Sequence, residues 1–432
     1  MYEPRKQAPQ VARDLPPNAS ASDAYGIPSA GKAMPDALEV CGAPRDNVQF
    51  AANAPRVVFI GPERTDARCA KRIAALHDQG WKVIGCTFYR DRGEPHQPAA
   101  WDNIHLGTTY DRRHVHRVWA VIRALGIILK NRDRLLEVNV LYAINFDNAL
   151  LALFVRLVCF RRVSLVVEIA DIQPVMTGTG IVSRFLRSLE RFVLRRSKLL
   201  VTTSPAFLRR YFEPVQRFRG SVVLLENKVY PSAALAAARK PRIGPVNNRH
   251  WTIGYFGSYR CERSIALICR LAGEFPDKLS FVLHGVPTSL DSDYFHKSVR
   301  RYPNIRYCGP YRYPDDLPAM YSSVDFNWCF DFSATGGNST WLLPNRIYEG
   351  GLFHCPALAL AGTETAAWLR SHGLGREFEE DLFESLKEFF NTLTVGAWEA
   401  MRERCEEAPD GLFTAEEDYR NWSARIELLA NE

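Results

Sequence analysis

The sequence has no long hydrophobic run. Its longest unbroken apolar stretch is residues 149–155, whereas a helix that crosses a bilayer needs about 20 apolar residues. The first ten residues are polar and include two prolines, so they lack the apolar stretch of a secretory signal. We therefore expect a cytoplasmic chain without a membrane-spanning helix.

Metal-binding and disulfide patterns are also missing. The ten cysteines include no C-x-x-C pair, and the ten histidines include no H-x-x-x-H pair. These absences predict reduced thiols, no metal and no cofactor. A D-x-D pattern at Asp291 and Asp293 precedes an expected helix, so we interpret it as a helix cap.

The charge excess is modest. Lys and Arg number 55 against 48 Asp and Glu, which gives a net charge of +7. This excess suits an anionic ligand or an anionic membrane surface, but it is too small to indicate a nucleic-acid partner. A content of 47% hydrophobic and 24% charged residues over 432 positions predicts a globular protein of two or three domains.

The chain divides into five segments by composition and periodicity. Residues 1–54 are rich in proline and predict a disordered tail. Short apolar strands then alternate with helical patterns over 55–231 and again over 250–395, which predicts two α/β domains with mostly parallel sheets. Residues 232–249 are a predicted linker, and residues 396–432 predict charged helices that can pack back on the first domain.

Glycines end several predicted strands, namely Gly61, Gly257, Gly285 and Gly309. Ligands of open α/β sheets bind beyond the carboxyl ends of the strands, where backbone amides meet phosphates. Any one such glycine can equally be a tight turn. After Gly257 and Ser258 come Arg260 and Arg263, which would share one face of a starting helix and bracket a diphosphate, or else form a solvated helix start.

The region 336–351 combines small polar residues with a helix start and an acidic residue. Asn338 and Ser339 come first, Asn345 and Arg346 begin the expected helix, and Glu349 follows one turn later. A helix N-terminus binds phosphate and a carboxylate binds ribose hydroxyls. This pattern therefore predicts a nucleotide site, although a capped helix with Glu349 in solvent is the alternative.

These motifs, in this order, resemble the GT-B glycosyltransferases, especially the large retaining family 4. The resemblance covers most of residues 55–395 and includes 57–61, 201–204, 225–227, 253–257, 304–309 and 345–356. It implies two Rossmann-like doubly wound domains facing a central cleft, with the acceptor on the first and a nucleotide-sugar donor on the second. It also implies that Glu349 binds the donor ribose, that the Gly257 loop receives the diphosphate, and that the anomeric configuration is retained.

Two positions depart from the family pattern. The family has a second glutamate eight residues before the one matching Glu349, and this chain has Trp341 there. Ala170 stands where the family has histidine, which leaves Asp171 as the catalytic carboxylate, with Glu168 and Gly61 also on the acceptor side. Asn338 and Ser339 are the nearest polar residues to replace the missing glutamate.

The segment 181–196 predicts a basic amphipathic helix. Phe185, Leu189 and Phe192 lie on one face, and Arg184, Arg187 and Arg191 lie on another. Such a helix can bind an anionic membrane through its arginines. A core helix with a solvated arginine face is the alternative.

Together these features predict a hexosyltransferase-type enzyme (EC 2.4) of envelope or exopolysaccharide biosynthesis. Its predicted partners are a nucleoside-diphosphate sugar, a saccharide or lipid-linked saccharide acceptor, and the inner face of the plasma membrane. Two alternatives are a nucleotide-sugar 2-epimerase of the same fold and a non-catalytic sugar-binding homologue.

Overall fold

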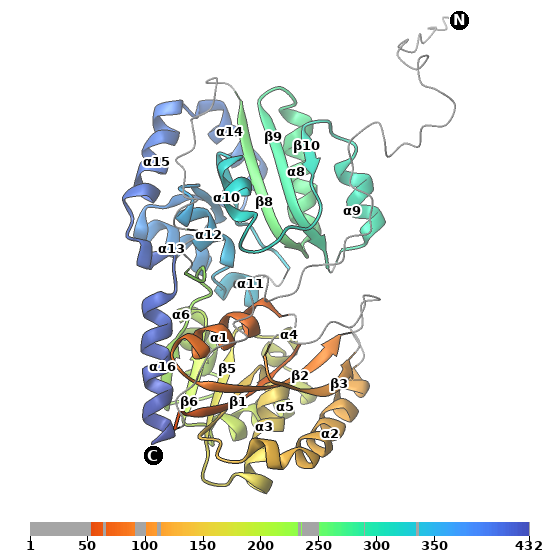
Figure 1. The fold of residues 1–432 in the computed structure, drawn as a ribbon. Helices are drawn as coiled ribbons and strands as arrows, with labels where there is room; N and C mark the ends of the chain where they lie inside the picture. Colours follow the sequence, from red (N-terminus) through yellow and green to blue (C-terminus); the bar gives the residue numbers. More distant parts are fainter. Residues whose placement is uncertain are drawn as a thin grey trace, which may run out of the picture. The chain divides into compact units, whose positions relative to one another are not determined.

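The computed structural model describes residues 53–63, 66–90, 101–109, 114–231, 235, 250–288, 290–333 and 337–431. Nearly all of the predicted tail and linker lie outside these residues. The described chain forms two parallel β-sheets, each with helices packed against it (Figure 1). None of the helices seen in these ranges is both long and apolar enough to span a bilayer.

The first sheet has seven parallel strands in the order β3-β2-β1-β4-β5-β6-β7. The strand order reverses direction between β1 and β4, which is where doubly wound sheets bind ligands. The strands are β1 (Arg56–Gly61), β2 (Lys82–Arg90), β3 (Asn103–Thr109), β4 (Val140–Ile144), β5 (Ser164–Ile169), β6 (Leu199–Thr202) and β7 (Ser221–Leu224).

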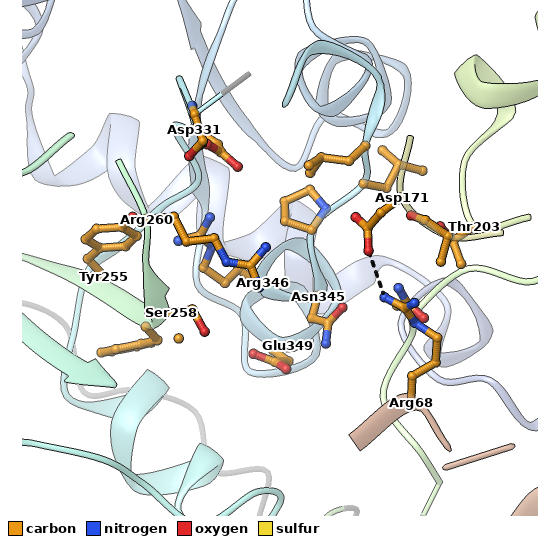
Figure 2. A pocket seen from close by; sticks show the side chains of 18 of the residues that line it. Arg68, Asp171, Thr203, Tyr255, Ser258, Arg260, Asp331, Asn345, Arg346 and Glu349 are labelled. Atoms are coloured by element: carbon orange, nitrogen blue, oxygen red, sulfur yellow. Dashed lines mark hydrogen bonds and ion pairs between the residues drawn. The ribbon is translucent and has the colours of Figure 1, made fainter. Parts of the chain in front are cut away.

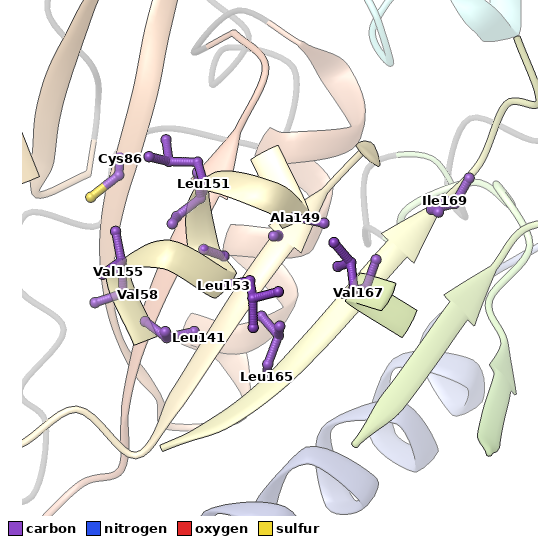
Figure 3. Packing of buried hydrophobic residues seen from close by; sticks show 14 of the residues in the cluster. Val58, Cys86, Leu141, Ala149, Leu151, Leu153, Val155, Leu165, Val167 and Ile169 are labelled. Atoms are coloured by element: carbon purple, nitrogen blue, oxygen red, sulfur yellow. The ribbon is translucent and has the colours of Figure 1, made fainter. Parts of the chain in front are cut away.

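Helices cover both faces of this sheet, whose central strands β1, β4, β5 and β6 are almost entirely buried. One face packs on α2 (His114–Lys130), α3 (Phe146–Cys159) and α5 (Ile181–Leu194). Figure 3 shows the centre of that core, where Leu151 and Val155 of α3 meet Val58, Leu141 and neighbouring strand residues. The other face packs on α1 (Ala67–Asp78) and on the last helix, α16 (Glu416–Ala430).

Short elements complete the first domain. They are η2 (Arg132–Leu135), α4 (Pro174–Thr177), α6 (Pro205–Phe207) and a π-helical turn, η3 (Leu208–Phe212).

The second sheet has six parallel strands in the order β10-β9-β8-β11-β12-β13. Its strands are β8 (Trp251–Tyr259), β9 (Leu279–Pro287), β10 (Ile305–Tyr307), β11 (Phe326–Trp328), β12 (Ala357–Leu360) and β13 (Gly375–Phe378). Its helices are α8 (Glu262–Glu274), α9 (Ser292–Val299), α10 (Leu317–Ser322), α11 (Asn338–Trp341), α12 (Asn345–Leu352), α13 (Glu364–His372), α14 (Leu382–Thr392) and α15 (Val395–Glu407). The sequence analysis did not identify β3, β13, α11, α13 or α14.

The C-terminal segment contacts both domains. Trp398 of α15 is buried in the core of the second sheet. After the short η4 (Asp410–Leu412), Trp422 of α16 is buried against the first sheet, and Ser423 accepts a hydrogen bond of 2.9 Å from the Trp81 indole. The last 15-residue helix therefore belongs to the core of the first domain.

Candidate active site

A cavity of about 320 Å³ lies beyond the carboxyl ends of strands from both sheets (Figure 2). This position is the one that open α/β sheets use for ligands. The first domain supplies Arg68, Ala170, Asp171, Thr203 and Asn227, and the second supplies Tyr255, Phe256, Gly257, Ser258, Arg260, Tyr311, Asp331, Ser333, Leu342, Leu343, Pro344, Asn345, Arg346 and Glu349.

The end of β8 provides one wall of the cavity. Gly257 has a φ of +112°, a backbone conformation that favours glycine, and Ser258 follows it at the cavity edge. Arg260 also lines the cavity. It precedes α8, which begins at Glu262, so its guanidinium is carried by the loop and not by the helix.

Helix α12 provides a neighbouring part of the wall. Its first residues, Asn345 and Arg346, line the cavity, and Glu349 lies one turn further in (Figure 2). The guanidinium of Arg346 lies over the ring of Tyr255, with its carbon 4.9 Å from the ring centre. This cation–π contact fixes the direction of Arg346 beside the β8 loop.

Glu349 is a buried carboxylate at the cavity wall. Its side chain is 3% exposed, and the Tyr321 hydroxyl donates to its Oε2 at 3.0 Å. Burial raises the pKa of Glu349, while the charge of Lys71 and the Tyr321 hydrogen bond act in the opposite direction. The interpretation of Glu349 as a solvent-facing residue of a capped helix is therefore wrong.

Asp171, directly after β5, links the two sides of the cavity. Its Oδ2 lies 3.5 Å from the Arg68 guanidinium, and the Asn338 side-chain amide donates to its Oδ1 at 3.3 Å. Figure 2 shows the Arg68–Asp171 pair at the cavity wall. The Nε atom of Arg68 is buried without a hydrogen-bond partner, so Arg68 retains donor capacity at this site.

Trp341 lies where the resemblance implies a glutamate. Its ring packs against the apolar core of the first domain, and its backbone carbonyl accepts a hydrogen bond from the Ser204 hydroxyl. Asn338 of the same short helix accepts a hydrogen bond of 2.9 Å from the Ile172 amide. In this chain α11 thus serves as a contact between the domains, and neither Trp341 nor Asn338 lines the cavity.

Two residues expected on the acceptor side are enclosed in the first domain. Glu168 has no exposed surface, forms an ion pair of 3.1 Å with Arg72 and accepts a hydrogen bond from Tyr142. Gly61 is buried where a side chain would meet the Cys69 sulfur at 2.9 Å. Both expectations are wrong, because Glu168 neutralises a buried arginine and Gly61 allows α1 to approach β1.

Three residues expected at the donor also lie outside the cavity wall. Arg263 is on α8, where it pairs with Glu380 at 3.1 Å and covers Phe332. Gly285 approaches Gly257 so closely that a Cβ would lie 1.7 Å from its carbonyl oxygen, and Ser339 is buried on α11. Arg263 does not bracket a ligand with Arg260, because only Arg263 is helical.

The expected arrangement of α5 is reversed. Arg187 donates to the Gly178 carbonyl at 2.6 Å, and Arg191 donates to the Val215 carbonyl at 2.7 Å, so both arginines hold neighbouring backbone. Phe185, which the alternative of a core helix would bury, is 64% exposed. Of the three arginines expected to bind a membrane, only Arg184 is exposed.

The D-x-D pattern forms a helix cap. Asp291 accepts a hydrogen bond of 2.7 Å from the Tyr294 amide at the start of α9. Within the described ranges, His, Cys, Asp and Glu side chains form no group of three or more that could hold a metal ion.

The sequence analysis missed several residues of the cavity, above all Arg68, Tyr255 and Tyr311. Arg68 begins the helix that follows β1, the strand at the point where the sheet order reverses, and that position was a usable signal. Tyr311 has no motif around it, and only the folded chain brings it to Glu349.

Comparisons with known proteins agree with this architecture. The chain is 33% identical over 379 residues to the succinoglycan biosynthesis protein ExoL of Rhizobium meliloti (strain 1021), which covers 87% of this chain and 93% of ExoL. The structure of this chain is similar to that of sucrose-phosphate synthase from Thermosynechococcus elongatus. The TM-score is 0.63 and the sequence identity is 15%, and the match covers 87% of this chain and 99% of the synthase chain.

A further structural neighbour is HepE of Anabaena in complex with UDP, with a TM-score of 0.56 and 13% identity over 86% of this chain and 99% of HepE. No protein-family model matches the sequence. The fold is thus the GT-B fold of glycosyltransferases, and the chain belongs to the family of the succinoglycan biosynthesis protein ExoL.

Proposed function

We propose that this protein is a glycosyltransferase that moves a sugar from a nucleoside-diphosphate sugar to a saccharide or lipid-linked saccharide during exopolysaccharide assembly. One observation carries the proposal. Three guanidinium groups, those of Arg68, Arg260 and Arg346, line the same cavity as the buried carboxylate of Glu349. A nucleoside diphosphate needs this combination of cations for its phosphates and an acceptor for its ribose hydroxyls.

The donor would span the cavity from α12 to the β8 loop. Glu349 accepts hydrogen bonds from the ribose, while Arg260, Arg346 and the backbone beyond Gly257 bind the diphosphate. UDP is the natural first probe, because HepE, which shares the fold, was solved with UDP. The sugar then faces Asp171 and Arg68 of the first domain, where the acceptor enters.

In the reaction the bond between the anomeric carbon and the diphosphate oxygen breaks, and the acceptor hydroxyl oxygen bonds to that carbon. The hydroxyl proton leaves with the diphosphate or with solvent, and the electron pair of the broken bond stays on the diphosphate. Arginines that contact the departing oxygens lower the barrier because negative charge grows there. Asp171, held by Arg68 and Asn338, stabilises the positive charge that develops on the sugar ring.

Two finer features belong to the same proposal. Transfer retains the anomeric configuration, since the resemblance to retaining enzymes is carried by the Glu349 helix and the Gly257 loop. Guanidinium groups supply the charge that neutralises the diphosphate, so transfer needs no metal. The family relationship to a succinoglycan biosynthesis protein supports a saccharide acceptor.

The test measures nucleoside diphosphate release from a panel of nucleotide-sugars, with and without lipid-linked saccharides extracted from a polysaccharide-producing bacterium. We expect release that depends on the acceptor and that falls in an Asp171→Asn variant, while Glu380→Gln, outside the cavity, behaves as the parent. A 2-epimerase would convert the sugar without acceptor. A sugar-binding homologue would bind the donor and release nothing.

A further inference from the structure

Exposed apolar side chains gather on one part of the first domain. Ten of the fourteen large hydrophobic residues that stand out as exposed in the described ranges lie on α2, α3, α4 and α5. They are Trp119, Ile122, Phe154, Leu157, Val158, Val175, Ile181, Val182, Phe185 and Phe192, and we call them the outer apolar face. Single exposed hydrophobic residues are ordinary, but a contiguous group marks an interaction surface.

The spacing places these residues on the outward side of each helix. Phe154, Leu157 and Val158 are three and four residues apart on α3, and Ile181 and Phe185 are four apart on α5, so each set forms one stripe. The opposite sides of α2, α3 and α5 are buried together in one core, and α3 contacts both α2 and α5. The three stripes therefore form one continuous surface.

The same surface carries basic but no exposed acidic side chains. Arg123, Lys130 and Arg184 lie on it beside the apolar residues, and all three are exposed. Within α2, α3 and α5 the only acidic residues are Asp147, which is half-buried in the first turn of α3, and Glu190, which is 2% exposed. An apolar surface bordered by cations fits the interface of an anionic bilayer.

The distribution of polar and apolar side chains on α5 also supports a membrane-binding surface. Glu190 is buried and accepts hydrogen bonds from Tyr211 and Gln216, and Arg187 and Arg191 bind backbone carbonyls of the domain. Glu190, Arg187 and Arg191 thus stabilise the domain, while Ile181, Val182, Phe185 and Phe192 of the same helix remain exposed. A helix that faced only water would present the opposite arrangement.

We propose that the outer apolar face inserts into the headgroup region of a bilayer that contains anionic lipids, with Trp119 and Phe185 among the inserted side chains. This goes beyond the transfer reaction and holds whatever the donor is. A second copy of the chain is a poorer occupant, because a symmetric contact would bring the arginines and lysine of the two copies together.

Binding to vesicles tests the proposal with the full chain. We expect co-sedimentation with vesicles of phosphatidylcholine and phosphatidylglycerol at low salt, and weaker binding to phosphatidylcholine alone. The variant Phe154→Ser/Ile181→Ser/Phe185→Ser should need at least about ten times more lipid for half-binding. Leu428→Ser, which changes an exposed leucine of α16, is the matched control and should bind as the parent.

Tryptophan fluorescence supplies a second readout. Trp119 is 68% exposed, whereas the other eight tryptophans are buried or half-buried. Lipids brominated near the headgroup should therefore quench Trp119 emission, and Trp119→Phe should remove that quenching while the variant still binds. Donor affinity by calorimetry should be unchanged in each variant, which separates this proposal from the proposed function.

Three results would overturn the inference. The first is absence of binding to the anionic vesicles at low salt. The second is a triple variant that binds as tightly as the parent, since binding would then be purely electrostatic. The third is a dimer in sedimentation velocity that the triple variant dissociates, because the face would then be an interface between copies.

Discussion

The substitution Glu349→Gln tests the donor site most directly. It removes one negative charge and keeps the volume of the side chain and an oxygen that can accept the 3.0 Å hydrogen bond from Tyr321. A hydrogen bond to a charged group is worth about 1.5–3 kcal/mol. Losing the charged acceptor for the ribose should therefore weaken UDP binding about 10- to 100-fold.

The direction of the pKa shift gives the same variant a second signature. Burial raises the pKa of Glu349, so the empty site loses its charge at a higher pH than an ordinary glutamate does. As the pH is lowered through this raised pKa, the affinity of the parent for UDP should fall more steeply than that of Glu349→Gln, because the UDP phosphate takes up a proton in both cases and Glu349 does so only in the parent. Folding should not suffer, because a neutral side chain at a buried position avoids the cost of desolvating a charge.

Isothermal calorimetry with UDP, ADP and GDP between about pH 5 and 8 measures both effects. Glu380→Gln is the control, since its carboxylate is paired with Arg263 outside the cavity. An affinity of Glu349→Gln equal to that of the parent, with the same pH dependence, would refute the assignment of the ribose to this carboxylate.

Three further predictions concern the reaction and the fold. In steady-state kinetics Arg260→Ala should lower kcat about 10- to 100-fold, more than it raises the donor KM. Arg263→Ala, the control, should have kcat and KM values close to those of the parent. If Arg260→Ala changed only KM, Arg260 would act in ground-state binding of the donor. EDTA should leave transfer intact, and a loss of activity that manganese restores would contradict the metal-independent proposal. Burial raises the pKa of Glu190 from about 4.5 to about 7, so the folded state binds the proton more tightly than the unfolded chain does, and the stability of the fold decreases as the pH rises between these values. In urea unfolding, Glu190→Gln should therefore be more stable than the parent by up to about 3 kcal/mol at pH 8 and by little at pH 4.5. A stability gain that does not depend on pH would contradict this cause.

The sequence predicted the architecture well because strand and helix periods are local. Short, mostly apolar strands alternate with helical patterns, and both sheets are parallel with the expected elements near their centres. The ends of the helices and strands depend on tertiary contacts, which the periodicity of apolar residues does not encode. The helix expected at 118–129 begins at His114, and the strand expected at 326–330 ends at Trp328.

Site residues were predictable where backbone position alone aims the side chain. Gly257, Asn345 and Glu349 sit at a strand end or in the first turns of a helix, and those places face the cavity in any doubly wound sheet. The assignment of Arg260 and Arg263 as a pair failed because it required both to be helical. Arg260 lies two residues before α8 begins at Glu262, so its side chain does not share the helical face of Arg263.

Charged residues that could face either a ligand or the protein interior could not be assigned to one role from the sequence. Glu168 follows the strand pattern of a site residue, but its partner Arg72 lies 96 positions away and is itself buried, so neither charge predicts the other. The arginines of α5 gave the same difficulty. A basic stripe on a helix suggests a surface, yet Arg191 donates hydrogen bonds to the carbonyls of Val215 and Gln216, which follow the π-helical turn. Phe185 and Phe192 are exposed instead.

The exchange of glutamate for Trp341 is explained only by the fold. A tryptophan gains free energy by burying its ring, and here the apolar core of the first domain receives it. The carbonyl of Trp341 then accepts from Ser204, and Asn338 binds both the Ile172 amide and Asp171. Helix α11, the segment that carries a glutamate in the family, thus orients the carboxylate of Asp171 in the first domain. Among the described residues of the cavity wall, Asp171 is the only acidic side chain from the first domain.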